Sequence, residues 1–387
     1  MTTLIEVKNV EQKKALNAWA RGGFVGSIIA GTGFGKSRCG VLAAAHILGK
    51  SEDAKGLVLV PTTQLKDQFE AEFAKWGEEA CLPQLEVMCY QSAYKLKGEE
   101  YDIVICDEVH MGLSPKYRRF FENNSYKSLL CMTATMPEEP EYCIKLQQLA
   151  PTNYRISLDE CVSLGLVSPY EIHCIPVELT KKERKDYVEI NNKFVYWSYQ
   201  LGQDAFNEAR RVLASSTAPS EMKNAAAQFY NSIRKRKKIV DFAQRKKTAL
   251  KKIVKKAKGD KILVFTGANA FTDKLAEATA PNSTTYHSKK SKKQRDLAIK
   301  EFKEGTKTVL CSTKALNQGF DVPDAGIGVI CGLTSKSLSM VQRVGRLIRF
   351  QEGKVGKIYI LYVKDSQEEK WLNNSVKDLK NIIWHEK

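Results

Sequence analysis

The sequence predicts an α/β protein with two parallel-sheet domains and a basic helical insertion between them. Two observations predict the sheets: short apolar runs alternate with helical periodicity over residues 24–131, and the same rhythm returns over residues 261–362. A third observation predicts the insertion, because residues 181–258 have a helical pattern and carry 21 Lys and Arg against 7 Asp and Glu. The expected units are a first domain at 1–150, a linker and basic helical insertion at 151–258, and a second domain at 259–387.

Length and composition indicate an intracellular enzyme. The 387 residues suffice for two or three domains that each bury a core, and no apolar run reaches the ~18 residues of a membrane span. The ten cysteines are scattered without a C-x-x-C pair, as is typical of buried thiols in a reducing compartment. We therefore expect a cytoplasmic protein, in the host cytoplasm if a virus encodes it, with no membrane partner. The net charge of +17 indicates an anionic partner.

The first strand and the turn after it predict a phosphate-binding loop. Phe24–Ile29 is a short apolar run, the turn that follows is rich in glycine, and the residues after Ser37 have a helical pattern. Backbone N–H groups of the turn, the N-terminus of the helix and the charge of Lys36 would all face one anion. The general pattern G-x-x-x-x-G-K-[ST] begins with Gly, whereas this chain has Ala30 there. The predicted nucleotide-binding residues of the loop are Ala30, Gly31, Thr32, Gly33, Phe34, Gly35, Lys36, Ser37 and Arg38.

A carboxylate pair at the end of a later strand predicts the hydrolytic centre. The remaining strands expected in the first sheet are Leu57–Val60, Leu85–Cys89, Asp102–Cys106 and Ser128–Cys131. Open parallel sheets place their ligand sites at the carboxyl ends of their strands, and Asp107 and Glu108 follow such an end. We expect Asp107 and Ser37 to hold Mg²⁺, and Glu108 to polarise the attacking water.

The second half repeats the α/β rhythm but has no second phosphate loop. The expected strands are Lys261–Phe265, Thr284–Tyr286, Thr308–Cys311, Gly328–Cys331 and Ile358–Tyr362. The expected helices are Ala268–Ala278, Lys292–Phe302 and Leu338–Leu347, with one last helix over Trp371–Trp384. The two sheet domains should face a cleft that holds the nucleotide.

Six motifs, taken in order, resemble those of superfamily 2 helicases. They include the loop ending in Gly35-Lys36-Ser37, the Asp-Glu-Val-His run at Asp107, STKALNQGFDVP at Ser312–Pro323 and QRVGRLIR at Gln342–Arg349. The sequences of these motifs look most like those of the DEVH-type branch of XPB, UvsW and restriction-enzyme motor subunits. The resemblance implies RecA-like domains, ATP and Mg²⁺ as cofactors, and ATP hydrolysis coupled to movement along nucleic acid.

The resemblance also implies roles for single residues. Arg346 and Arg349 are three apart, so both project from one helical face, and with Gln342 they would serve the γ-phosphate as catalytic residues. The implied nucleotide contacts outside the loop are Gln12 on adenine, Gly319, and Asp321 on the ribose hydroxyl. The implied nucleic-acid contacts are Thr62, Gln64, Gln91, Thr266 and Thr313. Thr133-Ala134-Thr135 would relay the state of the nucleotide to the nucleic-acid side.

The basic insertion has two interpretations, a solvated helical face or a surface for nucleic acid. We favour the second because it lies in a chain with a nucleotide site, and we expect phosphate contacts from Lys235, Lys237, Lys246 and Lys247. The aromatic run Phe194–Tyr199 is predicted to form the core of the insertion rather than a platform on which bases stack.

The leading functional hypothesis is an ATP-dependent DNA helicase or translocase. DNA is favoured over RNA as the partner, since the box reads DEVH and is neither DEAD nor DEAH. An RNA helicase and a nucleic-acid-binding scaffold with a vestigial ATPase remain alternatives. Proteins of replication, recombination or repair are candidate partners, and the oligomeric state stays open.

Overall fold

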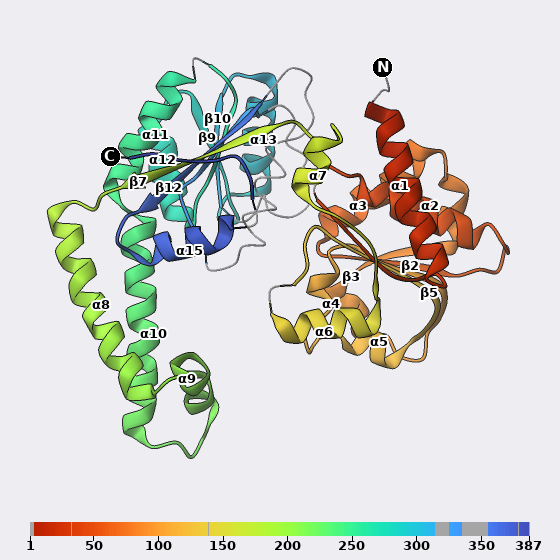
Figure 1. Cartoon of the computed structure of the whole chain (residues 1–387), viewed down its shortest axis with the longest axis horizontal. Helices are drawn as coiled ribbons and strands as arrows, with labels where there is room; N and C mark the ends of the chain where they lie inside the picture. Colours follow the sequence, from red (N-terminus) through yellow and green to blue (C-terminus); the bar gives the residue numbers. More distant parts are fainter. Residues whose placement is uncertain are drawn as a thin grey trace.

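The computed structural model describes residues 4–31, 33–137, 139–257, 259–313, 325–334, 355–377 and 379–386. The chain forms two lobes, each built around a twisted parallel sheet, and a pair of long helices projects from the second lobe (Figure 1). This arrangement confirms the predicted α/β class with two sheet units. Among the described residues, no helix is both long enough and apolar enough to cross a membrane.

The first sheet has the order β3-β2-β4-β5-β1-β6 among the described residues, and its pairings are parallel. The five strands that the apolar runs predict are confirmed, and β6 is an addition that lies beyond residue 150 and pairs with β1. The strands are β1 (Val25–Ala30), β2 (Gly56–Val60), β3 (Leu85–Cys89), β4 (Glu100–Cys106), β5 (Ser125–Thr133) and β6 (Thr152–Ile156).

Helices cover both faces of the first sheet, because alternate side chains of each strand point to opposite faces. Val58 packs in one core and Leu59 in the other, although both are adjacent in β2 and fully buried. The helices α1 (Leu4–Arg21), α2 (Lys36–Leu48) and α3 (Thr63–Trp76) lie on one face. The helices α4 (Tyr90–Ala93), α5 (Arg119–Asn123) and α6 (Pro140–Leu149) lie on the other (Figure 1).

The second sheet has the order β13-β7-β12-β11-β8-β10-β9 among the described residues, again with parallel pairings. Its helices are α11 (Gln244–Lys256), α12 (Asn269–Ala278), α13 (Lys292–Glu304) and α15 (Gln367–Val376). Its strands are β7 (Tyr170–Val177), β8 (Ile262–Phe265), β9 (Ser283–Tyr286), β10 (Val309–Ser312), β11 (Ile327–Ile330), β12 (Gly356–Val363) and β13 (Ile382–Trp384). The helix expected over Leu338–Leu347 lies outside the described residues.

The last predicted helix, Trp371–Trp384, is wrong in its second half. Helix α15 ends at Val376, and Ile382–Trp384 instead forms β13, which pairs with β7. Asn381 turns the chain with a φ of 57°, and its carbonyl accepts the backbone N–H of Ile172 in β7. The backbone of β7 needs a partner on this side, and that requirement outweighs the weak helical pattern.

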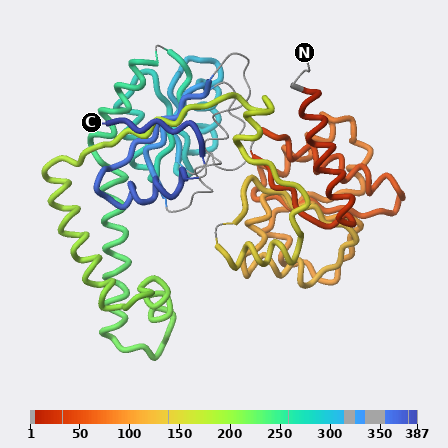
Figure 2. The backbone as a smooth tube through the Cα atoms, in the orientation of Figure 1, coloured from red at the N-terminus to blue at the C-terminus, as the bar shows by residue number. Residues whose placement is uncertain are grey.

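The insertion consists of α8 (Lys181–Leu201), α9 (Ala205–Ala214) and α10 (Ser220–Asp241), and the traced chain runs out along α8 and returns along α10 (Figure 2). Thr180 begins α8 with a capping box that includes Glu183. The two long helices meet through Phe194, whose ring stacks on Phe229 at 5.4 Å between centroids. The helical insertion is therefore confirmed, and half of the aromatic run forms its core, while Tyr196 and Tyr199 are exposed.

A buried ion pair anchors α11, the helix that follows the insertion, within the second lobe. The Lys246 ammonium in α11 lies 2.8 Å from both carboxylate oxygens of Glu368 in α15, and it also donates to the Cys331 carbonyl at 2.8 Å. Both side chains are fully buried. Burial raises the pKa of the Glu368 carboxyl, and the charge of Lys246 opposes that rise. Lys246 was expected to contact phosphate; the structure corrects this, because the ammonium is enclosed and fully bonded.

Removing one member of this pair should destabilise the second lobe strongly. Glu368→Gln leaves the Lys246 charge buried without a counter-charge, so we expect a loss of about 3–5 kcal/mol. The measurement is urea unfolding followed by circular dichroism. Glu304→Gln is the control, since its pair with Lys300 is exposed and 3.9 Å long, and it should cost about 0.2–1 kcal/mol. Equal midpoints for the two variants would contradict a structural role for the buried pair.

Candidate active site

The phosphate loop joins β1 to α2, and two glycines give it its shape. Gly33 and Gly35 have φ values of 92° and 91°, a region that side chains with a Cβ rarely adopt. Gly35 is the N-cap of α2 and has no side chain to cover the first amides of the helix. The helix N-terminus is therefore open to an anion, as the sequence predicts. Thr32 lies outside the described residues.

Lys36 lies inside the curve of this loop. Its ammonium donates to the carbonyl of Ala30 at 2.8 Å, so the charge is held at the point where the strand ends and the turn begins. Ser37 follows it in the first turn of α2 and is partly exposed. The two residues thus stand beside the open helix N-terminus, where a phosphate would bind.

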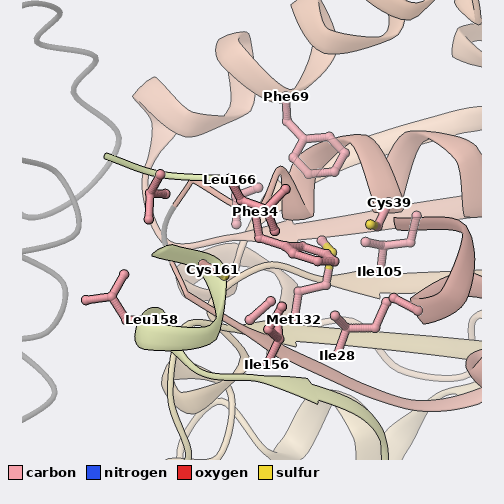
Figure 3. Packing of buried hydrophobic residues seen from close by; sticks show 14 of the residues in the cluster. Ile28, Phe34, Cys39, Phe69, Ile105, Met132, Ile156, Leu158, Cys161 and Leu166 are labelled. Atoms are coloured by element: carbon pink, nitrogen blue, oxygen red, sulfur yellow. The ribbon is translucent and has the colours of Figure 1, made fainter. Parts of the chain in front are cut away.

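Phe34 anchors the loop in the core beneath it. Its side chain is fully buried and lies among Met132, Ile156, Cys161 and Leu166 (Figure 3). The short helix α7 (Leu158–Ser163) belongs to this cover, and a Cβ on Gly33 would approach Val167 to 2.3 Å. The segment after β6 therefore closes over the back of the loop. Sequence reasoning missed this role, although a lone aromatic residue in a glycine turn was its signal.

Gln12 ties α1 to the loop, and Arg38 fixes its orientation. The Gln12 amide nitrogen donates to the Phe34 carbonyl at 2.8 Å, and its oxygen accepts from the Arg38 guanidinium at 2.9 Å. Arg38 also donates to the side chain of Asn9 and lies 4.2 Å above the ring of Trp76 in α3. A groove of about 400 Å³ between α1 and α2 includes Asn9, Gln12 and Arg38. The amide nitrogen also donates to the Gly35 carbonyl at 3.4 Å, so one lone pair of the Gln12 oxygen remains for a base in that groove.

The carboxylate pair, Asp107 and Glu108, follows β4. Like the phosphate loop after β1, it lies at the carboxyl ends of the strands. Asp107 donates its backbone N–H to Leu59, and its carbonyl accepts the hydroxyl of Tyr90. Burial and the neighbouring charge of Glu108 raise the pKa of Asp107 to about 7, while Lys36 acts against that rise. Because β4, β5 and β1 are parallel neighbours in the sheet, the phosphate loop after β1 and the carboxylates after β4 lie at the same carboxyl ends of the strands.

This donor set fits a divalent cation. A crowded carboxylate pair is relieved by bound positive charge, and Mg²⁺ prefers a few carboxylate oxygens with water completing its shell. Asp107, together with Ser37 in the first turn of α2, would hold it. Among the described residues, no group of three His, Cys, Asp or Glu side chains has metal-binding geometry.

Thr133, at the end of β5, connects the carboxylates to the Thr-Ala-Thr run. Its hydroxyl has two acceptors within reach of its one hydrogen, the Thr135 carbonyl at 3.1 Å and the Glu108 carboxylate at 3.4 Å, and it lies 3.4 Å from His110. Glu108 itself has a φ of 48°, which turns its side chain out of the strand direction. The water-polarising residue proposed from sequence is thus held by the neighbouring strand.

The residues expected to contact nucleic acid fall into two groups. Thr62 caps α3, and Gln91 donates to the Pro61 carbonyl at 3.0 Å, so the turns after β2 and β3 lie together with Gln64 exposed beside them. Thr266 is fully buried, and its hydroxyl lies 2.6 Å from that of Thr272. Its contact with nucleic acid stays a prediction. Thr313, after β10, is also largely buried.

A polar turn after β9 was missed by the sequence analysis. His287 is buried beside Asp273 at 3.1 Å, Lys290 pairs with the same carboxylate at 3.1 Å, and Asn269 bonds Ser288. The signal was a His-Ser-Lys-Lys run directly after a strand end. Five residues for which the resemblance implies a role lie outside the described residues: Gly319, Asp321, Gln342, Arg346 and Arg349.

Two family models match the chain on either side of the insertion. Residues 7–138 match the model described as type III restriction enzyme, res subunit, and residues 245–351 match the helicase conserved C-terminal domain. The chain belongs to the superfamily 2 helicases. Membership makes it a nucleic-acid-dependent ATPase, and its two sheets are the RecA-like domains of that family.

Individual relatives of this helicase differ in how much of it they match. The DNA 3'-5' translocase XPB2 of Sulfurisphaera tokodaii is 27% identical over 354 residues, which are 87% of this chain and 77% of the relative. The pre-mRNA-splicing ATP-dependent RNA helicase PRP28 of Candida glabrata is 34% identical over 98 residues, which are 25% of this chain and 17% of that protein. The crystal structure of the Pyrococcus furiosus Hef helicase domain has the same fold, with a TM-score of 0.55, 17% identity, and coverage of 94% of this chain and 98% of that one.

The contact between Gly35 and Gln12 yields a test of the loop in this helicase. A Cβ on Gly35 would lie 2.3 Å from the Gln12 amide nitrogen, so Gly35→Ala should displace α1 and weaken ATP binding at least tenfold, which corresponds to ~1.4 kcal/mol. Gly77→Ala is the matched control, because Gly77 also has positive φ but would meet nothing within 4 Å among the described residues. Titration with a fluorescent ATP analogue measures both. Unchanged binding by Gly35→Ala would contradict the loop geometry.

Proposed function

We propose that this helicase is an ATP-driven translocase that acts on DNA. The observation that carries the ATPase part is the meeting of Lys36, Asp107 and Glu108 at one edge of the first sheet, with the open N-terminus of α2 beside them. Similarity to a DNA translocase, at 27% identity over 87% of the chain, supports DNA as the substrate; RNA stays the alternative, because an RNA helicase matches 92% of the chain at 23% identity.

In the proposed reaction the protein binds ATP, orients the attacking water and neutralises the charge of the phosphates. The loop amides and Lys36 would hold the β- and γ-phosphates, and the adenine would enter the groove beside Gln12. Mg²⁺, bound through Ser37 and Asp107, would supply neutralising charge at the phosphates. Glu108, held by Thr133, would orient the attacking water and accept its proton.

The second domain would complete the site and bind the nucleic acid. By resemblance, Gln342, Arg346 and Arg349 would stabilise the charge that develops on the γ-phosphate, and Gly319 and Asp321 would contact the nucleotide. The loops after β2 and β3 with Thr62, Gln64 and Gln91, and those after β9 and β10 including Thr313, would follow the nucleic-acid backbone. Cycles of ATP binding and hydrolysis would then move the strand along these loops.

The choice of nucleic acid is tested by ATP hydrolysis. Turnover is measured with single-stranded DNA, duplex DNA, forked DNA and RNA of matched length at one salt concentration. Stimulation by DNA that exceeds stimulation by RNA supports the proposal. Preference for RNA would replace it with an RNA helicase, and basal turnover that no nucleic acid raises would replace it with a scaffold that retains a vestigial ATPase.

Two substitutions should stop turnover for different reasons. Glu108→Gln removes the water-orienting carboxylate but leaves the phosphate contacts, so we expect ATP affinity to remain within about threefold and turnover to fall by at least 10². Lys36→Ala removes the charge beside the phosphates, and both affinity and turnover should fall. Binding of a fluorescent ATP analogue and release of phosphate are measured together. Parental turnover in both variants would show that the nucleotide site lies elsewhere.

The basic insertion should add to DNA binding through exposed lysines only. Lys237 pairs with Asp241 at 2.7 Å and Lys246 is buried, so the informative substitutions are Lys238→Glu with Lys251→Glu, both on exposed positions. If each lysine contacts a phosphate, the slope of log affinity against log salt should fall by about 1.8 on duplex DNA.

The control for this pair is Lys50→Glu with Lys97→Glu, an equal change of charge at exposed positions of the first lobe. It should leave the slope nearly unchanged, and basal ATPase should survive in both variants. An identical slope for the insertion variant and the parent would reduce the insertion charge to a solvated face.

A further inference from the structure

A groove of about 520 Å³ runs between α8 and α10 in the insertion, away from the nucleotide site. We call it the insertion groove. From α8 it is lined by Asn192, Lys193 and Tyr196, and from α10 by Gln228, Asn231 and Lys235, among others. These positions recur at spacings of three and four along each helix, so each set forms one helical face. The volume falls within the range of about 300–1,000 Å³ that small-ligand sites occupy.

An exposed aromatic ring lies in this groove. The Tyr196 side chain is 54% exposed and packs edge-on against Trp197, with centroids 4.8 Å apart and planes at 76°. The neighbouring Phe194 ring stacks on Phe229, and the Arg236 guanidinium lies 4.1 Å above Phe194, so α8 and α10 are packed together at this level. Tyr196 therefore contacts Trp197 while more than half of its side chain stays open to solvent. An open aromatic ring is a surface on which a nucleobase stacks.

Polar side chains around the ring provide donors and acceptors. Within the described part of the chain, the amides of Asn192, Gln228 and Asn231 make no side-chain hydrogen bond, although all three line the same groove. Each amide offers two N–H donors and an acceptor, which is the complement that the edge of a base requires. A protein helix seated here would have to leave these amides unmatched against an apolar face.

The charge around the groove favours a polyanion. Lys193 and Lys235 line it from the two helices, and the carboxylate of Glu189 at its edge is paired with Lys193 at 2.7 Å. The surrounding residues 181–258 carry 21 Lys and Arg against 7 Asp and Glu. A ligand with a flat ring between two phosphates matches this arrangement of ring, amides and flanking ammonium groups.

We propose that the insertion groove binds one unpaired base of a DNA strand, stacked on Tyr196 and bonded at its edge by Asn192, Gln228 and Asn231. Lys235 neutralises the phosphate on one side of that base, and Lys193 neutralises the other by exchanging its exposed pair with Glu189 for the phosphate. The inference rests on the proposed DNA-dependent function and deepens it, since it assigns the insertion a subsite for single-stranded bases in addition to contacts with the backbone.

The test uses the full chain and a short oligothymidylate that carries a single 2-aminopurine, whose fluorescence falls when it stacks. Tyr196→Ala should lose the quenching and weaken binding by about 5- to 150-fold, the range expected for one stacked base. Tyr196→Phe keeps the ring and should retain both. Tyr199→Ala is the control on the same helix, since Tyr199 is 84% exposed but is not among the residues that line the groove. Circular dichroism confirms that each variant is folded.

A second arm replaces the 2-aminopurine nucleotide with an abasic site of the same charge. The wild-type chain should bind the abasic strand more weakly, and Tyr196→Ala should bind the two strands equally. Equal binding of both strands by the wild-type chain would overturn the groove inference while leaving DNA-stimulated ATPase, and so the proposed function, intact. Self-association of the chain that Tyr196→Ala abolishes without DNA would also overturn it in favour of a protein interface.

Failure of the proposed function gives a different result. In that case the wild-type chain shows neither binding of the oligonucleotide nor stimulation of ATP hydrolysis by it, and the groove inference falls as well. Basal ATPase of Tyr196→Ala should equal that of the wild-type chain, because the groove lies in the insertion and the nucleotide loop lies in the first lobe.

Discussion

Parallel pairing of the strands is the constraint on which the site depends. Every described pairing in the two sheets is parallel, so all the loops that follow the strands of a sheet lie at the same side, at the carboxyl ends of its strands. Lys36 follows β1, Asp107 follows β4 and Thr133 ends β5, and these three strands are neighbours or next neighbours in the first sheet. Residues separated by about a hundred positions in the chain therefore lie close together because of strand pairing alone, and no long loop has to bring them together. An antiparallel strand among them would send its polar turn to the opposite edge.

The phosphate loop illustrates how a flexible segment is held in a single shape. Its glycines permit the required backbone angles but do not favour them over others, so the conformation must be stabilised from outside. Phe34 anchors the loop below, and the Gln12 amide fixes the carbonyls of Phe34 and Gly35 from the side. Arg38 in turn leaves Gln12 one orientation, because the guanidinium can only donate. Preorganised donors of this kind avoid the cost of ordering the loop when phosphate binds.

Local patterns predicted most of this architecture, and the errors have physical causes. Strands such as β2 and β4 are buried on both faces, so they stand out as continuous apolar runs. Strand β7 alternates buried and half-buried residues and β13 has three residues, so their pairing is a tertiary event with a weak local signal. The prediction that Lys246 contacts phosphate was wrong for a related reason. A count of charges treats all lysines alike, whereas Lys246 is buried against Glu368 and its neighbours are exposed. The aromatic run 194–199 shows the same limit. Phe194 is in the core of the insertion and Tyr196 is exposed, and this difference depends on where α10 packs against α8.

The attachment of the insertion determines how it can move. Lys246 bonds Glu368 and the Cys331 carbonyl, and Lys237 bonds Asp241, whose carboxylate packs against Gly267 in the turn after β8. These contacts join the base of α10 and the start of α11 to the carboxyl edge of the second sheet, where the turns after β8 and β11 lie. Bending at this junction would break contacts of buried charged groups, which is costly. We therefore expect the insertion to follow the second lobe when that lobe rotates, so that the far ends of α8 and α10 travel further than their base.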